Sequence, residues 1–282
     1  MIPKMSETVP WNSIRTFTHT MEKTMKNQVP VTFLMFTLAL PATTLTQAAL
    51  IEGSNRPDVL IGADDDNLEN PEIQPPGTTA NQSLDNADVL LGNGGNDVII
   101  GLRGSDTMQG GPGRDILIGG LEAGTTSPKS DIMFGDAGND IGIWAGGDGS
   151  DAFKGGPGID ALVFATVDRD GIVPILTEPV LGFPGGIPTA NATGQNGFCT
   201  LEQVPDDSSL GYAFLVRFFS KAAGNALLAT VRVDDDVEQV FCTSETAAEV
   251  TFADLREATP QFVEVFLEEV ERINLTVAGI IR

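Results

Sequence analysis

Residues 92–163 repeat a pattern of six mostly polar, glycine-rich positions followed by three largely apolar ones. The units read GNGGNDVII, GLRGSDTMQ and GGPGRDILI over 92–118, and GDAGNDIGI, GGDGSDAFK and GGPGIDALV between 135 and 163. Successive side chains of a strand point to opposite faces, so the eighth position of each unit points inward and its neighbours point outward. The pattern predicts short strands joined by tight turns, with glycine at the first and fourth places and aspartate at the sixth.

Two units complete one coil of eighteen residues, so aspartates eighteen positions apart stack on the same edge. Glycine reaches backbone angles that other residues avoid, and a turn built from it exposes carbonyl oxygens beside the aspartate carboxylate. We therefore expect two ladders of carboxylates, a first edge and a second edge. The first edge carries Asp58, Asp97, Asp115, Asp140 and Asp160, and the second edge carries Asp88, Asp106, Asp131 and Asp151.

This nonapeptide resembles the repeats-in-toxin family, whose haemolysin-type repeats form a calcium-binding parallel β-helix. The resemblance covers residues 53–164 and implies a mainly β fold, a right-handed parallel β-roll over 50–164 that holds several Ca²⁺ ions between stacked turns. The gaps along both edges leave room for up to about seven ions, each with six to eight oxygen ligands. The implied ligands are the turn residues Asp58, Asp88, Gly92, Asn93, Gly95, Asp97, Gly101, Gly104, Asp106, Gly110, Gly111, Gly113, Asp115, Asp131, Gly135, Asp136, Gly138, Asp140, Gly146, Gly147, Gly149, Asp151, Gly155, Gly156, Gly158 and Asp160.

The charge of the chain also favours a cation as its partner. The formal net charge is −23, from 39 acidic and 16 basic residues. Such a charge argues against nucleic acid or an anionic membrane surface as a partner. Stacked carboxylates repel one another without a cation, so we expect the metal-free chain to be loose or unfolded and metal binding to supply folding free energy. A metal-free glycine-rich solenoid is the alternative, and it would leave the recurring aspartates without a partner.

Residues 1–49 have the order of an export leader with a signal peptide. Two lysines precede an apolar stretch over 31–40, and a proline and small residues follow. Translation from Met21 or Met25 would suit such a signal better than translation from the first residue. An uncleaved membrane anchor is the alternative, although the stretch is short for a membrane span. Cleavage would leave a mature chain with neither a membrane span nor the single histidine, His19.

The two cysteines, Cys199 and Cys242, both lie outside the repeats. An even count in an exported protein predicts a disulfide between them. Closing a loop of that length stabilises a fold by about 4 kcal/mol in the chain-entropy description. Two buried free thiols are the alternative.

Insertions lengthen the predicted roll at two turns, over 63–86 and 120–129. Turns are where a β-helix tolerates insertion, and the assignment of the two edges assumes that neither insertion hides a half-coil. Leu102 and Arg103 depart from the turn pattern, and Gly142 takes the place of an inward aliphatic residue.

The outward positions on the strands that follow the first-edge turns are aliphatic. They include Val59, Ile61, Ile116 and Ile118, whereas those on the opposite strands are more polar. A contiguous apolar face of this size usually meets a partner surface. We expect the C-terminal region of the same chain to cover it, and a homo-oligomer formed through this face is the alternative.

Residues 165–282 leave the nonapeptide pattern and predict a smaller β-rich C-terminal domain of the α+β class. A turn-rich loop is expected over 177–197. Strands are expected over 212–219, 227–233 and 237–242. The stretch 262–273 fits both a helical stripe and strand alternation, and the spacing of Glu268 and Arg272 favours the helix.

No catalytic motif stands out once the leader is set aside. Without histidine the chain cannot build a His-based zinc site or a catalytic triad, and it has no GxSxG element. Acidic runs such as Asp206–Asp207 and Asp234–Asp236 are more typical of solvated turns or calcium ligands than of a glycosidase. The sequence therefore predicts a non-catalytic, secreted calcium-binding protein, located outside the cell, on its surface or in the periplasm. The alternatives are a calcium-dependent adhesin that recognises carbohydrate or another cell-surface ligand, and a carbohydrate-active enzyme that uses carboxylates alone.

Overall fold

The computed structural model describes residues 50–62, 87–120, 130–180, 182–191, 197–205, 211–243 and 249–281. The predicted leader, the insertion over 63–86 and nearly all of the insertion over 120–129 lie outside the described residues. What the sequence predicts for those segments stays a prediction.

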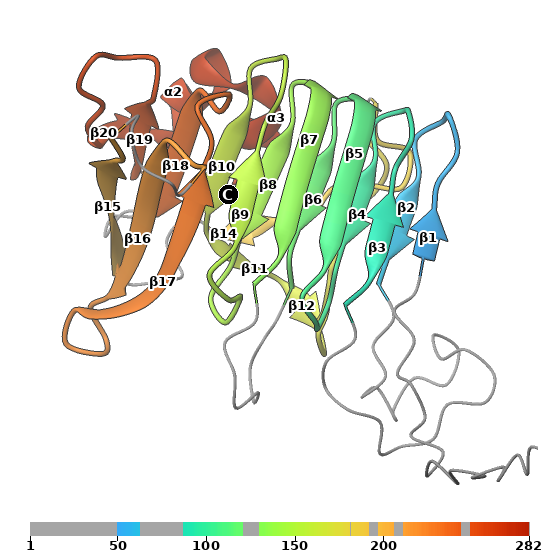
Figure 1. The fold of residues 1–282 in the computed structure, drawn as a ribbon, viewed down its shortest axis with the longest axis horizontal. Coiled ribbons are helices and arrows are strands. Elements are labelled where there is room, and N and C mark those ends of the chain that lie inside the picture. The colour runs from blue at the N-terminus through green and yellow to red at the C-terminus, as the bar shows by residue number, and fades with distance from the viewer. Residues whose placement is uncertain are drawn as a thin grey trace, which may run out of the picture. The chain divides into compact units, whose positions relative to one another are not determined.

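The repeats form short strands that alternate between two parallel stacks, sheet A and sheet B (Figure 1). In sheet A the repeat strands are β1 (Leu50–Glu52), β3 (Val89–Leu91), β5 (Thr107–Gly113), β7 (Ile132–Gly138) and β9 (Ala152–Lys154). In sheet B they are β2 (Val59–Ile61), β4 (Val98–Ile100), β6 (Ile116–Ile118), β8 (Ile141–Trp144) and β10 (Ala161–Phe164). Each strand pairs in parallel with the strand one coil away, as in the predicted β-roll.

The inner core of the roll lies between the two sheets and consists of the residues at the eighth place of the repeats. These are buried side chains with almost no exposed surface: Leu60, Leu90, Ile99, Met108, Leu117, Met133, Phe153 and Leu162. They come alternately from sheet A and sheet B, and each lies beside the inward residue of the same sheet one coil away. The predicted inward direction of the eighth place is confirmed.

Both sheets continue past the last repeat into antiparallel strands, as Figure 1 shows. Sheet A is extended by β17 (Ala226–Val233), β16 (Phe214–Ser220) and β15 (Gly197–Gln203), with β17 parallel to β9. Sheet B is extended by β18 (Gln239–Thr243), β19 (Glu249–Asp254) and β20 (Val263–Phe266), with β18 parallel to β10. Both sheets therefore continue with strands from beyond residue 165, where the sequence predicts a domain boundary. A separate C-terminal domain stays a prediction.

Aromatic residues fill the core where the repeats meet these extensions. The ring centroids of Trp144 and Phe164 lie 5.2 Å apart, and Trp144 lies 5.1 Å from Phe218 of β16. The indole nitrogen of Trp144 donates a hydrogen bond to the carbonyl of Gly149 at 2.9 Å, so the buried polar atom has a partner. The aromatic rings thus join the core of the repeats to the core of the extensions.

The C-terminal region covers the aliphatic outer face of sheet B. The covering elements are β11 (Thr166–Val167), β12 (Arg169–Asp170), β13 (Val173–Pro174), β14 (Ala190–Asn191), α2 (Leu267–Ile273) and α3 (Leu275–Ile280). Buried side chains of this layer belong to one cluster with Ile116 and Ile118 of β6, among them Phe183 from the segment between β13 and β14, Val270 of α2 and Val277 of α3. The predicted cover is confirmed, and burial of this face does not require a second copy of the chain.

The stretch 262–273 divides between the two structures that its sequence allows. Val263–Phe266 form strand β20, paired with β19, so the helix prediction is wrong for this half. The helix α2 begins at Leu267, with Glu268 and Glu269 in its first turn, where acidic side chains favour the helix dipole. Pairing with a neighbouring strand overrides the local preference before that point.

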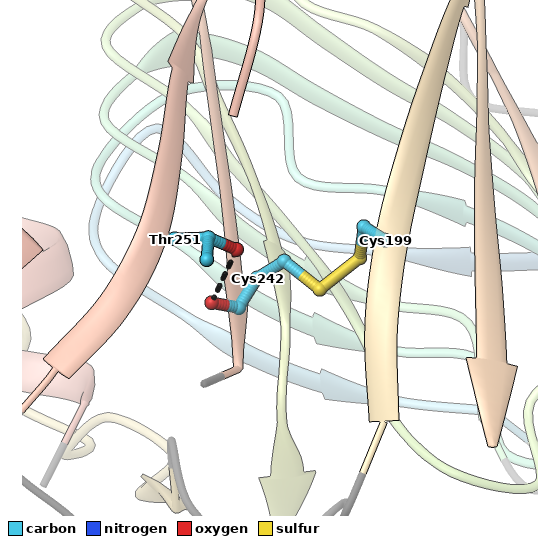
Figure 2. The surroundings of a disulfide bond; sticks show 3 residues. All are labelled: Cys199, Cys242 and Thr251. Atoms are coloured by element: carbon cyan, nitrogen blue, oxygen red, sulfur yellow. Dashed lines mark hydrogen bonds between the residues drawn. A yellow bond between two sulfur atoms is a disulfide. The ribbon is translucent and has the colours of Figure 1, made fainter. Parts of the chain in front are cut away.

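The predicted disulfide is present between Cys199 of β15 and Cys242 of β18, with 6.2 Å between their Cα atoms (Figure 2). Because β15 extends sheet A and β18 extends sheet B, the bond links the two sheets. Cys242 is buried, and its carbonyl accepts a hydrogen bond from the Thr251 hydroxyl at 3.2 Å. The described residues contain no free cysteine, since Cys199 and Cys242 are bonded to each other.

Candidate metal sites at the stacked turns

The glycines of the turns are required by close approach between coils. A Cβ atom at Gly113 would lie 1.5 Å from the carbonyl oxygen of Gly95, one coil away, and a Cβ at Gly110 would lie 2.4 Å from Oδ2 of Asp115. Real Cβ atoms do not approach that closely. Glycine at the first and fourth places therefore lets successive turns stack with the aspartate folded against its own turn.

The second place of the turns from residue 92 onward adopts a left-handed backbone conformation. Gly111 and Gly156 have φ values of 94° and 95°, which glycine adopts without strain. Asn93, Leu102 and Asp136 occupy the same place with φ values of 71°, 75° and 69°. Asparagine and aspartate tolerate this conformation better than leucine does, so Leu102 is held there by the burial of its side chain.

The aspartates of the first edge form a continuous ladder of hydrogen bonds. The backbone N–H of each donates to Oδ1 of the next: Asp58 to Asp97 and Asp97 to Asp115 at 2.8 Å, then Asp115 to Asp140 and Asp140 to Asp160 at 2.7 Å. The sequence placed these five residues on one edge. The stacking is confirmed.

The second edge has the same ladder. Asp88 donates to Asp106 at 2.8 Å, Asp106 to Asp131 at 2.7 Å and Asp131 to Asp151 at 3.0 Å. Sequence separations of 18, 25 and 20 residues still bring these pairs into register. Asp58 likewise stacks directly on Asp97 across a separation of 39 residues, so the assignment of the aspartates to the two edges holds on both sides of each insertion.

One carboxylate oxygen of each inner first-edge aspartate is left for another ligand. The residues Asp97, Asp115, Asp140 and Asp160 have no exposed surface, and their Oδ2 atoms are buried without a hydrogen-bond partner. A buried charged oxygen without a partner is strongly unfavourable. Four such atoms in a row indicate positions where a cation would be stabilising.

Burial changes the acidity of these side chains. It raises the pKa of Asp97 to about 6, of Asp115 and Asp160 to about 7 and of Asp140 to about 9, and the neighbouring carboxylates add to the rise. Asp58, at the exposed end of the ladder, behaves in the opposite way, because the backbone N–H and hydroxyl of Ser54 donate to its Oδ2 and lower its pKa. Protons and metal ions would therefore compete for the inner carboxylates.

The donor set fits calcium. In the part of the chain that the structure describes, no three carboxylate, histidine or cysteine side chains gather as a side-chain metal site. Each turn instead offers one carboxylate together with backbone carbonyl oxygens such as that of Gly110, which approaches Gly92 of the preceding coil. Hard oxygen donors of this kind suit Ca²⁺, whereas sulfur and imidazole would favour zinc or copper.

The structure brings the predicted aspartate and glycine ligands together in stacked turns. Besides the aspartate ladder it shows contacts at the fifth place, where Asn96 Oδ1 accepts from the Arg114 backbone N–H and Asn139 Oδ1 accepts from that of Ile159, both at 3.0 Å. This contact is not among those predicted from the sequence, although asparagine recurs at the fifth place.

A second unpredicted contact involves Asp148, at the third place of the turn before β9. Its Oδ2 accepts from the Ala145 backbone N–H at 2.8 Å and its Oδ1 from Arg169 at 3.0 Å. The ion pair is nearly buried and ties the last second-edge turn to the layer that covers sheet B. Asp148 therefore has a structural role that its position in a repeat does not reveal.

Comparison with known families identifies the repeats. Residues 85–125 and 128–141, from β3 to the start of β8, match the family model described as the RTX calcium-binding nonapeptide repeat (4 copies). No curated protein and no solved structure matches the chain. The same turn geometry continues outside the matched residues, at Asp58, Asp151 and Asp160. Within residues 85–141, the stacked glycine-aspartate turns are RTX calcium-binding nonapeptide repeats.

Proposed function

We propose that this is a secreted protein that binds several calcium ions between its stacked turns and folds as it binds them. The observation that carries the proposal is the row of buried Oδ2 atoms on Asp97, Asp115, Asp140 and Asp160, which have no hydrogen-bond partner. An ion between two turns would give each of these atoms the partner that it needs. Without ions the roll has to hold these carboxyl groups protonated or accept their repulsion.

Folding that depends on calcium binding would suit a protein that is exported from the cell. Calcium sites of extracellular modules have dissociation constants of about 10⁻⁴ to 10⁻³ M, far above the concentration of free calcium inside cells. The chain would stay unfolded before export and fold on reaching external calcium. The disulfide agrees with this route, because such bonds persist in oxidising compartments. Across the described residues, no helix is long and apolar enough to cross a membrane.

Calcium titration followed by circular dichroism tests the proposal. In EDTA we expect a weak β signal, and at about millimolar calcium we expect the full signal and a cooperative melting transition. Magnesium at the same concentration should be much less effective, because it requires a smaller octahedral site and gives up its water reluctantly. A melting curve that is the same in EDTA and in calcium would contradict the proposal.

A matched pair of variants locates the ions. Asp140→Asn keeps an oxygen for the N–H of Asp115 but removes the negative charge at the buried end of the side chain. Asp170→Asn makes the same chemical change at an exposed position in β12. The first variant should lower the calcium stoichiometry and the second should leave it unchanged. Equal stoichiometry in both variants would remove the first-edge aspartates from the set of ligands.

A groove in the covering layer favours carbohydrate recognition as a second candidate function. The groove has a volume of about 580 Å³ and is lined by Asp168, Thr177, Glu178 and Thr189 together with apolar residues. Carboxylates and hydroxyl groups beside an apolar floor suit the hydroxyls and ring faces of sugars. On a glycan array in calcium, binding that is lost in Glu178→Gln would support a calcium-dependent adhesin. An array without signal leaves calcium binding alone as the function.

A further inference from the structure

The first-edge ladder does not end at the last repeat. The backbone N–H of Asp160 donates to Oε2 of Glu238 at 2.7 Å, the same contact that joins each first-edge aspartate to the next. Glu238 lies 78 residues further along the chain, just before β18. The pairing of Ala161 with Gln239 between β10 and β18 places Glu238 level with Asp160.

The rest of this segment, residues 234–238, also stands in for a repeat turn. A Cβ atom at Gly155 would lie 2.6 Å from the carbonyl oxygen of Asp236, just as a Cβ at Gly135 would lie 2.7 Å from the carbonyl oxygen of Gly155. The carbonyl of Asp236 thus occupies the place of a first-position glycine carbonyl. In addition, the N–H of Gly155 donates to Oδ1 of Asp236 at 3.0 Å. The segment is shorter than a repeat and its sequence, DDDVE, has neither glycine nor the nonapeptide spacing.

An oxygen without a hydrogen-bond partner points into the gap between this segment and the last repeat turn. Oδ2 of Asp160 is buried without such a partner, and Asp160 has no exposed surface. The Cβ position of Gly155 is 2.4 Å from this Oδ2 and 2.6 Å from the carbonyl oxygen of Asp236. Both oxygens therefore border the same small space, as the corresponding oxygens do between two repeat turns.

The two edges end on opposite charges. On the second edge the guanidinium of Arg232 contacts the carbonyl of Ser150 at 3.4 Å, while its backbone N–H donates to the carbonyl of Asp151. A fixed cation thus lies against the last second-edge turn. The first edge ends instead on Asp160, Asp236 and Glu238.

The cations near the end of the first edge already have acidic partners. Lys154 pairs with Asp234 at 2.6 Å, and Arg256 pairs with Asp254 at 2.6 Å. Lys154 also attracts Asp236 and Arg256 also attracts Glu238, so they balance part of the negative charge at this end. The buried Oδ2 of Asp160 still has no hydrogen-bond partner, and a divalent cation would supply one.

We propose that Asp160, Asp236 and Glu238 complete a terminal calcium site, formed between the last repeat turn and the acidic segment 234–238. The Oδ2 of Asp160 and the carbonyl of Asp236 supply oxygens at the shared space, and the carboxylates of Asp236 and Glu238 add negative charge beside it. The site rests on the proposed calcium binding of the repeats, but it is not part of any nonapeptide. It would couple the C-terminal strands β17 and β18 to the calcium-bound state of the roll.

Calcium stoichiometry, measured by equilibrium dialysis on the full chain, tests this site with Asp236→Asn and Glu238→Gln. Both variants keep an oxygen that can accept the existing N–H bond, from Gly155 and Asp160 respectively, so the fold should persist. Asp235→Asn is the matched control, because Asp235 is exposed and differs from Asp236 by one position. We expect each test variant to bind one ion fewer than the wild type, or to bind one ion at least about tenfold more weakly, and the control to bind the wild-type number.

The outcomes separate this inference from the proposed function. A wild-type chain that binds no calcium would overturn the proposed function. Wild-type stoichiometry and affinity in both test variants would overturn the terminal site while calcium binding by the repeats stands. If a variant folds poorly, the shift of its melting temperature between low and saturating calcium gives the same answer. A shift equal to that of the wild type means that segment 234–238 is only a structural end, and a smaller shift supports the site.

Discussion

Gly142 and Phe153 show how neighbouring residues share the volume of the inner core. Gly142 is the one inward position of the described repeats without a side chain, and a Cβ there would lie 3.0 Å from two ring carbons of Phe153. Phe153 is fully buried and is the largest side chain at an inward place of the repeats. The missing aliphatic side chain is thus replaced by the ring from the opposite sheet. The departure from the repeat pattern is compensated locally.

We predict that restoring the repeat pattern at this position alone destabilises the protein. Gly142→Leu should lower the free energy of unfolding by about 1–3 kcal/mol, because overpacking forces strained side chains. Combined with Phe153→Leu, it should recover much of that loss, since the second change frees the ring's volume. Denaturant unfolding in saturating calcium measures both, and Met133→Leu serves as a nearly volume-conserving control at another inward place. Additive effects of the two changes would show that the residues do not compete for space.

Among the elements, the repeat strands are predictable together with their neighbours in the sheet, whereas for the strands after them only some of the ranges are. In the roll, the nine-residue repeat determines which side chains are buried. It also determines strand pairing, because each strand lies beside the equivalent strand of the next coil. The strands β16 and β17 also agree with the predicted ranges 212–219 and 227–233. Their partners do not follow from local sequence, since the parallel pairing of β17 with β9 joins segments about 80 residues apart.

The candidate metal sites also have a part that the sequence predicts and a part that it does not. The aspartate ladders follow from spacing alone, and the hydrogen bonds between Asp97 and Asp115 or Asp106 and Asp131 agree with it. The contact of Asp160 with Glu238 does not follow from spacing, because the segment 234–238 has neither glycine nor the nonapeptide spacing. Only the pairing of β10 with β18 brings Glu238 next to Asp160. The acidic run at 234–236 is visible in the sequence, but its partner is not.

At the scale of the whole molecule, the buried carboxyl groups make stability depend on pH and calcium together. In the metal-free fold, burial raises the pKa of Asp97, Asp115, Asp140 and Asp160 from 3.8 to between about 6 and about 9. The folded state therefore binds protons more tightly than the unfolded state. The stabilisation that this provides is complete below a pH of about 4 and is lost as the pH rises through these values.

We predict that in EDTA the β signal and the melting temperature are highest near pH 5 and fall toward about pH 8, where the metal-free chain becomes loose or unfolded, whereas in saturating calcium they fall less or rise. Calcium displaces the protons, so its binding becomes more favourable as the pH increases. Asp140→Asn, which removes the carboxyl group with the highest pKa, should weaken the pH dependence in EDTA. Thermal unfolding by circular dichroism at each pH measures these trends. A melting temperature in EDTA that rises over this pH range would contradict the linkage.

The covalent link between β15 and β18 bears on how the protein recovers after calcium is withdrawn. When the coils separate, the bond between Cys199 and Cys242 still holds the strands that continue the two sheets beyond the last repeat. In a repeat protein each unit is stabilised chiefly by its neighbour, so growth from a preformed end avoids the slow formation of a first coil. Once calcium returns, we expect the oxidised chain to rebuild its coils from Asp160 backwards toward Asp58, with the tethered strands as the template.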